Sequence, residues 1–168
     1  EFGEKMLTWT LVANGQTTVV PMSLNPLWVV APFKDVALGN TPPVLRFAQE
    51  GQTFSGPPRG IAATYNTDLS FPLRLDAWVT DDGIRAPEAR RPAPLVTVGW
   101  SLFRGPADVS FSSATPSVNE KTGQTTTNVR FRVPGEYILR IQVNDATGDG
   151  GGGFQCCWTN AHVKVLVQ

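Results

Sequence analysis

Hydrophobic and polar residues alternate along much of the chain, which is the two-residue period of β-strands with one buried face. The clearest sets of residues that share a strand face are Leu7, Trp9 and Leu11; Phe71, Leu73, Leu75, Ala77 and Val79; Val96, Val98, Trp100 and Leu102; Thr127, Val129, Phe131 and Val133; Tyr137, Leu139, Ile141 and Val143; and Val163, Val165 and Val167. Short strands are also predicted at residues 44–47 and 109–111. No segment of about 12 residues has a convincing helical period, so the pattern predicts an all-β fold.

The first strand is predicted to belong to a β-hairpin at about residues 6–22. Asn14 and Gly15 separate two β-rich runs, and both central residues of a type I′ turn need a positive φ. The apolar stretch LNPLWVVAPF follows and contains two prolines, which restrict it to an edge strand or an extended packing segment. GNTPP then marks a boundary. We therefore expect residues 1–39 to form a hairpin and apolar docking arm, and residues 40–168 a second domain.

The amino-acid composition indicates a fold with many turns and a hydrophobic core. The 168 residues include 16 Gly and 14 Pro, and 41% of the chain is hydrophobic. This combination is typical of short strands joined by frequent turns. The length fits one sandwich of about 100 residues together with a sizeable extension.

The order of the motifs LRLDAWVTDDG, VTVGWSLFRGPADVSF, TTTNVRFRVPGEYILRIQVNDATG and AHVKVLV resembles PKD-like, immunoglobulin-type domains of bacterial secreted and surface proteins. The resemblance covers about residues 66–168. It implies an immunoglobulin-like (PKD-like) β-sandwich that carries the N-terminal β-hairpin as an extension. It also implies that Trp100 lies in the core and that Tyr137 forms a corner by bonding back to the backbone. The implied role is non-catalytic: adhesion, spacing or docking outside the cytoplasm.

Charge and hydropathy exclude two classes of partner. Lysine plus arginine and aspartate plus glutamate both number 14, so no overall field would attract nucleic acid. No run approaches the roughly 18–20 apolar residues of a membrane helix, so we predict no transmembrane segment. The opening residues EFGEKM also lack the basic-then-apolar plan of a signal peptide.

Immunoglobulin topology brings the loop at residues 80–94 and the loop at residues 144–155 to the same end of the sandwich. Oxygen ligands on these loops can bind Ca²⁺, which prefers six to eight oxygens in a flexible geometry. Asx turns that satisfy the loop backbone are the alternative role for the same side chains. The candidate ligands are Asp81, Asp82, Asn144, Asp145 and Asp149.

The first of these loops also contains Arg85, Arg90 and Arg91. Guanidinium groups pair with carboxylates through two parallel hydrogen bonds, so the three arginines are a candidate docking anchor. A solvated surface loop is the alternative.

Cys156 and Cys157 are adjacent, and they are the only cysteines in the chain. Neighbouring Cα atoms lie about 3.8 Å apart, below the roughly 4.4–6.8 Å usual for disulfides, and neighbours on a strand point to opposite faces. This geometry favours two free thiols, with a vicinal disulfide as the main alternative and an intermolecular disulfide or a metal site as minor ones. A metal site with His162 lacks a fourth ligand and a recognised spacing.

No catalytic set is recognisable. His162 is the only histidine, and G-x-S-x-G, Walker and H-E-x-x-H motifs are absent. A nucleophile therefore has no evident base, and we predict that the protein is not an enzyme and needs no cofactor.

Four tryptophans besides Trp100 are candidate contact residues. Trp78 falls on the polar face of its strand and Trp158 follows the cysteines, so both are candidates to bind a sugar or a protein partner. Trp9 and Trp28 belong to the N-terminal arm.

These observations predict a periplasmic or cell-surface structural module whose arm contacts protein partners in a larger envelope or surface assembly. One alternative is a carbohydrate-binding module that uses Trp78 and Trp158. Another is the C-terminal domain of a processed secreted enzyme.

Overall fold

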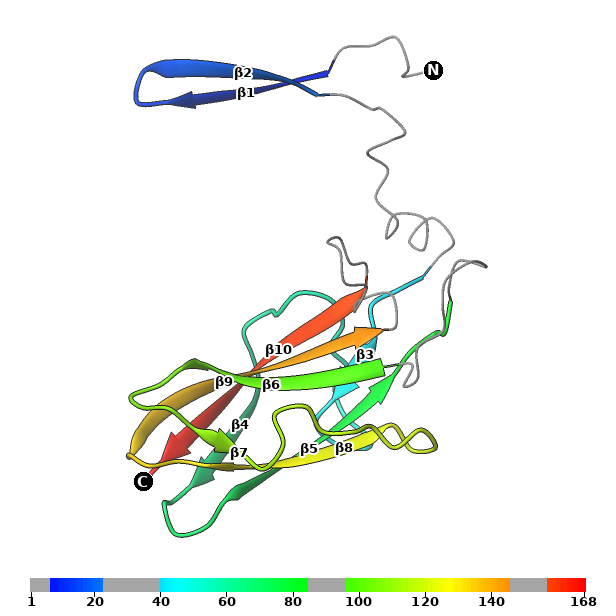
Figure 1. Cartoon of the computed structure of the whole chain (residues 1–168), viewed down its shortest axis with the longest axis vertical. Coiled ribbons are helices and arrows are strands. Elements are labelled where there is room, and N and C mark those ends of the chain that lie inside the picture. The colour runs from blue at the N-terminus through cyan, green and yellow to red at the C-terminus, as the bar shows by residue number, and fades with distance from the viewer. Residues whose placement is uncertain (1–6, 23–39, 85–95, 146–156) are drawn as a thin grey trace. The chain divides into compact units, whose positions relative to one another are not determined.

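The computed structural model describes residues 7–22, 40–84, 96–145 and 157–168 (Figure 1). Every regular element within these ranges is a β-strand. Contacts divide the chain into two compact units, Glu1–Val30 and Ala31–Gln168. The predicted boundary after residue 39 adjoins a range outside the described residues and stays a prediction.

The described part of the first unit is the predicted hairpin. β1 (Leu7–Ala13) pairs antiparallel with β2 (Gln16–Met22), and Trp9 lies opposite Val20. Asn14 and Gly15 connect the strands with φ values of 52° and 75°. Positive φ at both central residues matches the right-handed twist of the strands, so the hairpin prediction is confirmed.

The second unit contains two four-stranded sheets, which we call the two-sheet body (Figure 1). Its strands are β3 (Val44–Arg46), β4 (Ile61–Thr67), β5 (Leu73–Thr80), β6 (Val96–Arg104), β7 (Ser110–Phe111), β8 (Gln124–Arg130), β9 (Gly135–Asp145) and β10 (Trp158–Val167). One sheet has the order β4-β10-β9-β6, and the other has the order β3-β5-β8-β7. All neighbouring pairs are antiparallel except β4 and β10, which run parallel.

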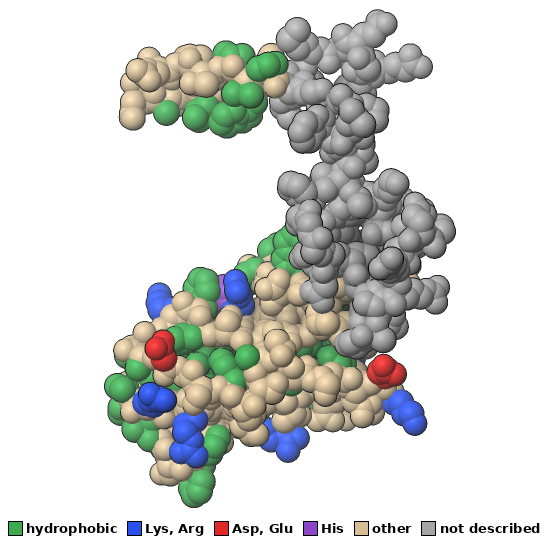
Figure 2. Space-filling view, viewed as in Figure 1, with side chains coloured by type: hydrophobic (Ala, Val, Ile, Leu, Met, Phe, Trp, Pro, Cys, Tyr) green, Lys and Arg blue, Asp and Glu red, His purple; other side chains and the backbone are tan. Residues whose placement is uncertain are grey.

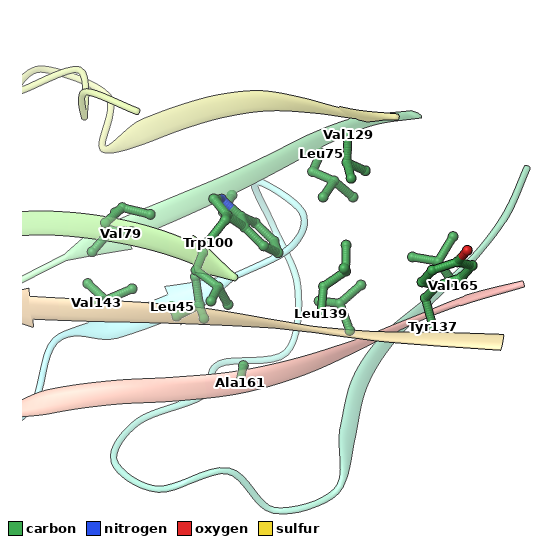
Figure 3. Packing of buried hydrophobic residues seen from close by; sticks show 14 of the residues in the cluster. Leu45, Leu75, Val79, Trp100, Val129, Tyr137, Leu139, Val143, Ala161 and Val165 are labelled. Atoms are coloured by element: carbon green, nitrogen blue, oxygen red, sulfur yellow. The ribbon is translucent and has the colours of Figure 1, made fainter. Parts of the chain in front are cut away.

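The core lies between the inward faces of these two sheets (Figure 3). Alternate residues of each long strand point into it, as the two-residue period requires. Leu75 and Val129 enter from one sheet, and Leu139 and Val165 enter from the other. Trp100 is only 5% exposed, which confirms its predicted core position.

Tyr137 anchors the turn that leads into β9. Its ring is completely buried, and its hydroxyl donates a hydrogen bond to the carbonyl of Val133 at 2.8 Å. The ring also packs against Gly105, where an added Cβ would overlap it, and against Phe131 with ring centroids 4.7 Å apart. The predicted tyrosine corner is therefore confirmed.

Two features differ from the alternating pattern. β4 was not predicted, because its sequence IAATYNT alternates weakly between apolar and polar residues. Phe71 and Val133 were expected on buried faces but are 77% and 42% exposed. Both lie outside the strands, in connections where the two-residue period no longer sets the direction of a side chain.

Candidate functional site

The first candidate calcium ligands, Asp81 and Asp82, organise their own loop. Asp82 Oδ2 accepts hydrogen bonds from the backbone nitrogen and hydroxyl of Thr41 at 2.8 and 2.6 Å, and its Oδ1 accepts one from the nitrogen of Ile84 at 2.8 Å. Asp81 accepts from the nitrogen of Gly83 at 3.0 Å. The bonds from Gly83 and Ile84 are local Asx-type bonds that stabilise turns, whereas the bonds from Thr41 connect this loop to a segment that is distant in sequence.

Asp145 lies at the end of β9 and is completely buried. Its Oδ2 accepts a hydrogen bond from Asn40 Nδ2 at 2.9 Å, and its backbone nitrogen donates to the carbonyl of Cys157 at 3.3 Å. A carboxylate removed from water needs such partners, which gives Asp145 a structural role. Because Asn40 and Thr41 are consecutive, their bonds hold Asp145 and Asp82 at one end of the two-sheet body, as the topology predicted.

Calcium binding itself stays a prediction. Within the described ranges, no group of three or more His, Cys, Asp or Glu side chains is arranged to hold a metal ion. Asn144 accepts a hydrogen bond from Gln142 Nε2 at 3.2 Å. The fifth candidate ligand, Asp149, lies outside the described residues, as do Arg85, Arg90 and Arg91 of the candidate docking anchor.

A cavity of about 690 Å³ adjoins the loop that contains Asp81 and Asp82. Val118, Glu120 and Lys121 line its other side. Its volume suits a small ligand, and the carboxylates of Asp81, Asp82 and Glu120 and the amine of Lys121 are among the polar groups that line it.

Cys157 differs from the favoured expectation. It is disulfide-bonded, so the prediction of a free thiol at this position is wrong. The only other cysteine in the chain, Cys156, lies outside the described residues. Cys157 is 6% exposed, and its Sγ lies 3.8 Å from the carbonyl oxygen of Asn40. A disulfide sulfur has no hydrogen to donate, so this approach is a packing contact.

Cys157 also has a φ of 78°, in the left-handed region that residues with a Cβ seldom occupy. The free-thiol prediction assumed that neighbouring side chains point to opposite faces, as they do on a strand. That rule applies only to extended backbone. Cys157 precedes β10 and is not extended, so that argument fails here.

The two tryptophans of the carbohydrate-binding alternative lie on different sheets. Trp78 projects from the outer face of β5, opposite Arg46 and Gln124, and is half-buried. Trp158 begins β10 on the outer face of the other sheet, opposite Asn144, and is 40% exposed. The outer faces of two packed sheets point in opposite directions, so these side chains do not form one binding surface.

Sequence reasoning missed a polar network on the outer face of β5 and β8. Arg74 donates two hydrogen bonds to Asp76 at 2.9 and 3.0 Å, and the hydroxyl of Thr126 donates a third at 2.5 Å. The bond from Arg74 is the main reason that the pKa of Asp76 lies below its usual value. Burial, and then the charge of Asp76, raise the pKa of Tyr65. The spacing of Arg74 and Asp76, two apart on one strand face, was the available signal.

His162 occupies the outer face of β10, away from the core, as its strand position predicts. Its ring packs on that of Phe103, with centroids 4.4 Å apart. Phe103 is 58% exposed. The only histidine of the chain therefore packs against an apolar surface ring.

Trp9 belongs to an apolar cluster on the hairpin. Trp9, Leu11 and Val20 are 52%, 45% and 44% exposed. No Lys, Arg, Asp, Glu or His occurs from residue 7 to residue 22, and the described hairpin surface in Figure 2 accordingly has hydrophobic and uncharged polar side chains only. We call Trp9, Leu11 and Val20 the hairpin cluster. Trp28 lies outside the described residues.

Within the described ranges, no helix is long and apolar enough to cross a membrane. No protein-family model matches the chain, and no curated protein matches its sequence. Among solved structures, the chain is similar to the crystal structure of the S-layer protein SbsC domains 4 and 5, with 11% sequence identity and a TM-score of 0.38. The match covers 97% of this chain and 57% of the other, so this chain spans little more than half the length of that protein chain.

Proposed function

We propose that the protein is a non-catalytic, extracytoplasmic structural module that docks into a larger surface or envelope assembly through its hairpin. The observation that carries this proposal is the hairpin cluster on a uniformly uncharged hairpin. An isolated two-stranded hairpin is only marginally stable in water. Contact with a partner would order these strands and remove their apolar side chains from solvent.

The energetic gain from docking is substantial. Complete burial of a large apolar side chain contributes roughly 1.5–3 kcal/mol relative to its exposed state. The side chains of the hairpin cluster are each about half exposed, so together they would supply about 3 kcal/mol. Backbone bonds made by the open hairpin edges would add to this gain.

An immunoglobulin-like sandwich is the fold class that we propose for the two-sheet body. The strand order β3-β5-β8-β7 corresponds to the order ABED of immunoglobulin constant domains, and β10-β9-β6 corresponds to GFC. β4 then extends the second sheet by one strand. The Tyr137 corner supports the same class. Membership in the PKD-like group stays a prediction.

The disulfide at Cys157 supports a location outside the cytoplasm. Disulfides persist in oxidising compartments, whereas cytoplasmic thiols are kept reduced. Periplasmic and cell-surface locations both satisfy this condition.

The test compares full-length variants in the native cell. Trp9→Ser with Leu11→Ser removes most of the hairpin cluster, and Phe71→Ser removes a more exposed apolar side chain from the two-sheet body as a matched control. We expect the hairpin variant to be lost from the envelope or surface fraction and the control to be retained as the wild type is. Equal retention of both variants would contradict docking through the hairpin.

A neutral glycan is a second candidate ligand, favoured by the surroundings of Trp158. The outer face beside it contains uncharged polar side chains, including Asn144 and Gln142, and the space above Gly99 is open. Stacking of a sugar on Trp158 next to amide groups is chemically suitable. A glycan array probed with and without calcium tests this candidate, and loss of any signal in Trp158→Ala would support it. Uniform absence of binding would exclude it.

A further inference from the structure

The four sheet edges of the two-sheet body differ in how they are protected from pairing with another strand. Unpaired edge strands are templates for strand addition, and proteins usually shorten, bulge, charge or cover them. β3 is covered, since Leu45 exchanges two backbone hydrogen bonds with Phe54 at 2.9 and 2.8 Å. β7 is only two residues long. β6 has a register shift between Leu102 and Arg104, and the nitrogen of Trp100 donates to the carbonyl of Ala114 at 2.7 Å.

β4, the edge beyond β10 (Figure 1), has little protection. It is seven residues long and contains neither proline nor a charged residue. A register shift next to Ala62 affects only its start, and Ala63–Thr67 pair with β10 in regular register. Its described backbone hydrogen bonds all lie on the β10 side, including the bond from the nitrogen of Gln168 to Thr67. The opposite side is open to a further strand within the part of the chain that the structure describes.

β1 has the properties that such an added strand requires. It is also seven residues long, with neither charge nor proline, and among the described residues it pairs with β2 alone. β2 is less suitable, because Pro21 has no backbone N–H to donate. The same chain therefore contains an open uncharged edge on the hairpin and an open uncharged edge on the two-sheet body.

We propose that β1 of one copy of this chain adds to β4 of a second copy and extends the sheet β4-β10-β9-β6. This inference builds on the proposed function and names the partner as the chain itself. Main-chain hydrogen bonds would supply affinity, as in other strand-addition complexes. Because neither β1 nor β4 contains a charged residue, pairing these strands would not remove a charged side chain of either strand from water.

A hollow beside β4 offers a place for one apolar side chain of the incoming strand. Its volume is about 370 Å³, and its lining combines the apolar residues Phe54, Pro57, Ile61 and Ala161 with polar residues that include Arg59 and Asn160. In strand addition, pockets next to the edge select side chains of the added strand. Trp9, the largest side chain of β1, is the one that we assign to this hollow.

The chain is long enough for an intermolecular contact. Residues 23–39, which join the hairpin to the body, have a covalent reach of at most about 60 Å. β1 and β4 are different surfaces, so the contact is head-to-tail and leaves one donor and one acceptor free at the ends of each assembly. Repetition of the contact then gives an open chain of copies or, if the rotation closes, a ring.

Three full-length variants test the proposal. The edge variant Thr64→Glu with Asn66→Lys places charges at exposed positions of β4, opposite Lys164 and Leu166 of β10. The matched control Thr115→Glu with Ser117→Lys places the same charges at exposed positions near the other edge of the sheet. The donor variant Thr10→Pro interrupts β1. Circular dichroism and thermal unfolding establish that the two-sheet body remains folded in each.

Sedimentation velocity over a range of protein concentrations measures self-association. We expect the wild type and the control to form species larger than the monomer. In the edge variant and the donor variant, self-association should weaken about tenfold or more. A mixture of these two variants should form a one-to-one complex, because one retains an intact donor and the other an intact acceptor.

Three results would overturn the proposal: a wild type that stays monomeric at every concentration, an edge variant that associates as the wild type does, or a mixture that forms no complex. A hairpin that docks on β4 of its own chain gives the first of these results. A monomeric wild type that still needs the hairpin cluster for retention in the surface fraction would refute self-pairing and leave the proposed function intact.

Discussion

Substitution of Tyr137 by phenylalanine isolates the contribution of the corner hydrogen bond. The ring stays in place against Gly105 and Phe131, so packing is preserved. Only the bond from the hydroxyl to the carbonyl of Val133 is lost. Val133 is 42% exposed, so water can reach this turn and the carbonyl does not become an isolated buried acceptor. We therefore expect the free energy of unfolding to fall by about 1 kcal/mol, near the middle of the range for a net hydrogen bond.

Urea unfolding followed by circular dichroism measures this change, and a thermal scan should give a midpoint about 3–6 °C lower. Tyr65→Phe is the matched control, because Tyr65 is half-buried and its hydroxyl makes no hydrogen bond to the described residues. Its effect should stay below about 0.5 kcal/mol. If Tyr137→Phe unfolds at the same urea concentration and with the same slope as the wild type, the corner bond contributes nothing and the argument fails.

Three further substitutions test individual contacts by urea unfolding. Gly123→Ala should lower the free energy of unfolding by about 3 kcal/mol, because Gly123 has a φ of 70° and an added Cβ would overlap the carbonyl oxygen of Val79. A decrease of less than about 1 kcal/mol would show that the turn adjusts to the added Cβ. Thr159→Val should cost about 2 kcal/mol, since the buried hydroxyl bonds to two loop backbone groups, and an unchanged midpoint would refute that role. Asp76→Asn should cost about 1 kcal/mol at neutral pH. Because the pKa of Asp76 is lowered in the folded state, its contribution is complete above the unfolded value of about 3.9 and is lost as pH falls through the folded pKa. A deficit that stays constant as the pH is lowered from neutrality to well below that unfolded value would contradict this assignment.

Alternation predicted most of the strands because a strand between solvent and core has to bury every second side chain. β5 and β9 follow this rule closely, with Leu75, Ala77 and Val79 buried on one and Leu139, Ile141 and Val143 on the other. β4 lies at a sheet edge and does not bury a regular set of apolar residues, so its sequence has no such signature. Phe71 was wrongly predicted to be buried. The alternation of apolar and polar residues continues to Phe71, but β5 begins only at Leu73, so Phe71 lies before the strand and is exposed.

Only those features of the candidate site that depend on strand order were predictable from the sequence. Strand order predicted that Asp82 and Asp145 lie at the same end of the two-sheet body, and their bonds to the consecutive residues Thr41 and Asn40 agree with this. Hydrogen-bond partners were not predictable, because Thr41 and Asn40 are distant in sequence and belong to no motif. The backbone conformation of Cys157 was not predictable either. Its φ of 78° depends on how the chain enters β10, and cysteine as a residue type does not favour this conformation.

Amide hydrogen exchange of the hairpin tests the central claim most directly. The isolated full-length chain at low concentration should exchange the backbone amides of residues 7–22 rapidly, because a solitary hairpin opens readily. In the native surface or envelope fraction, the same amides should exchange about a hundredfold more slowly, while the amides of β9 in the two-sheet body should be unchanged. Equally rapid exchange of residues 7–22 in both samples would contradict docking through the hairpin.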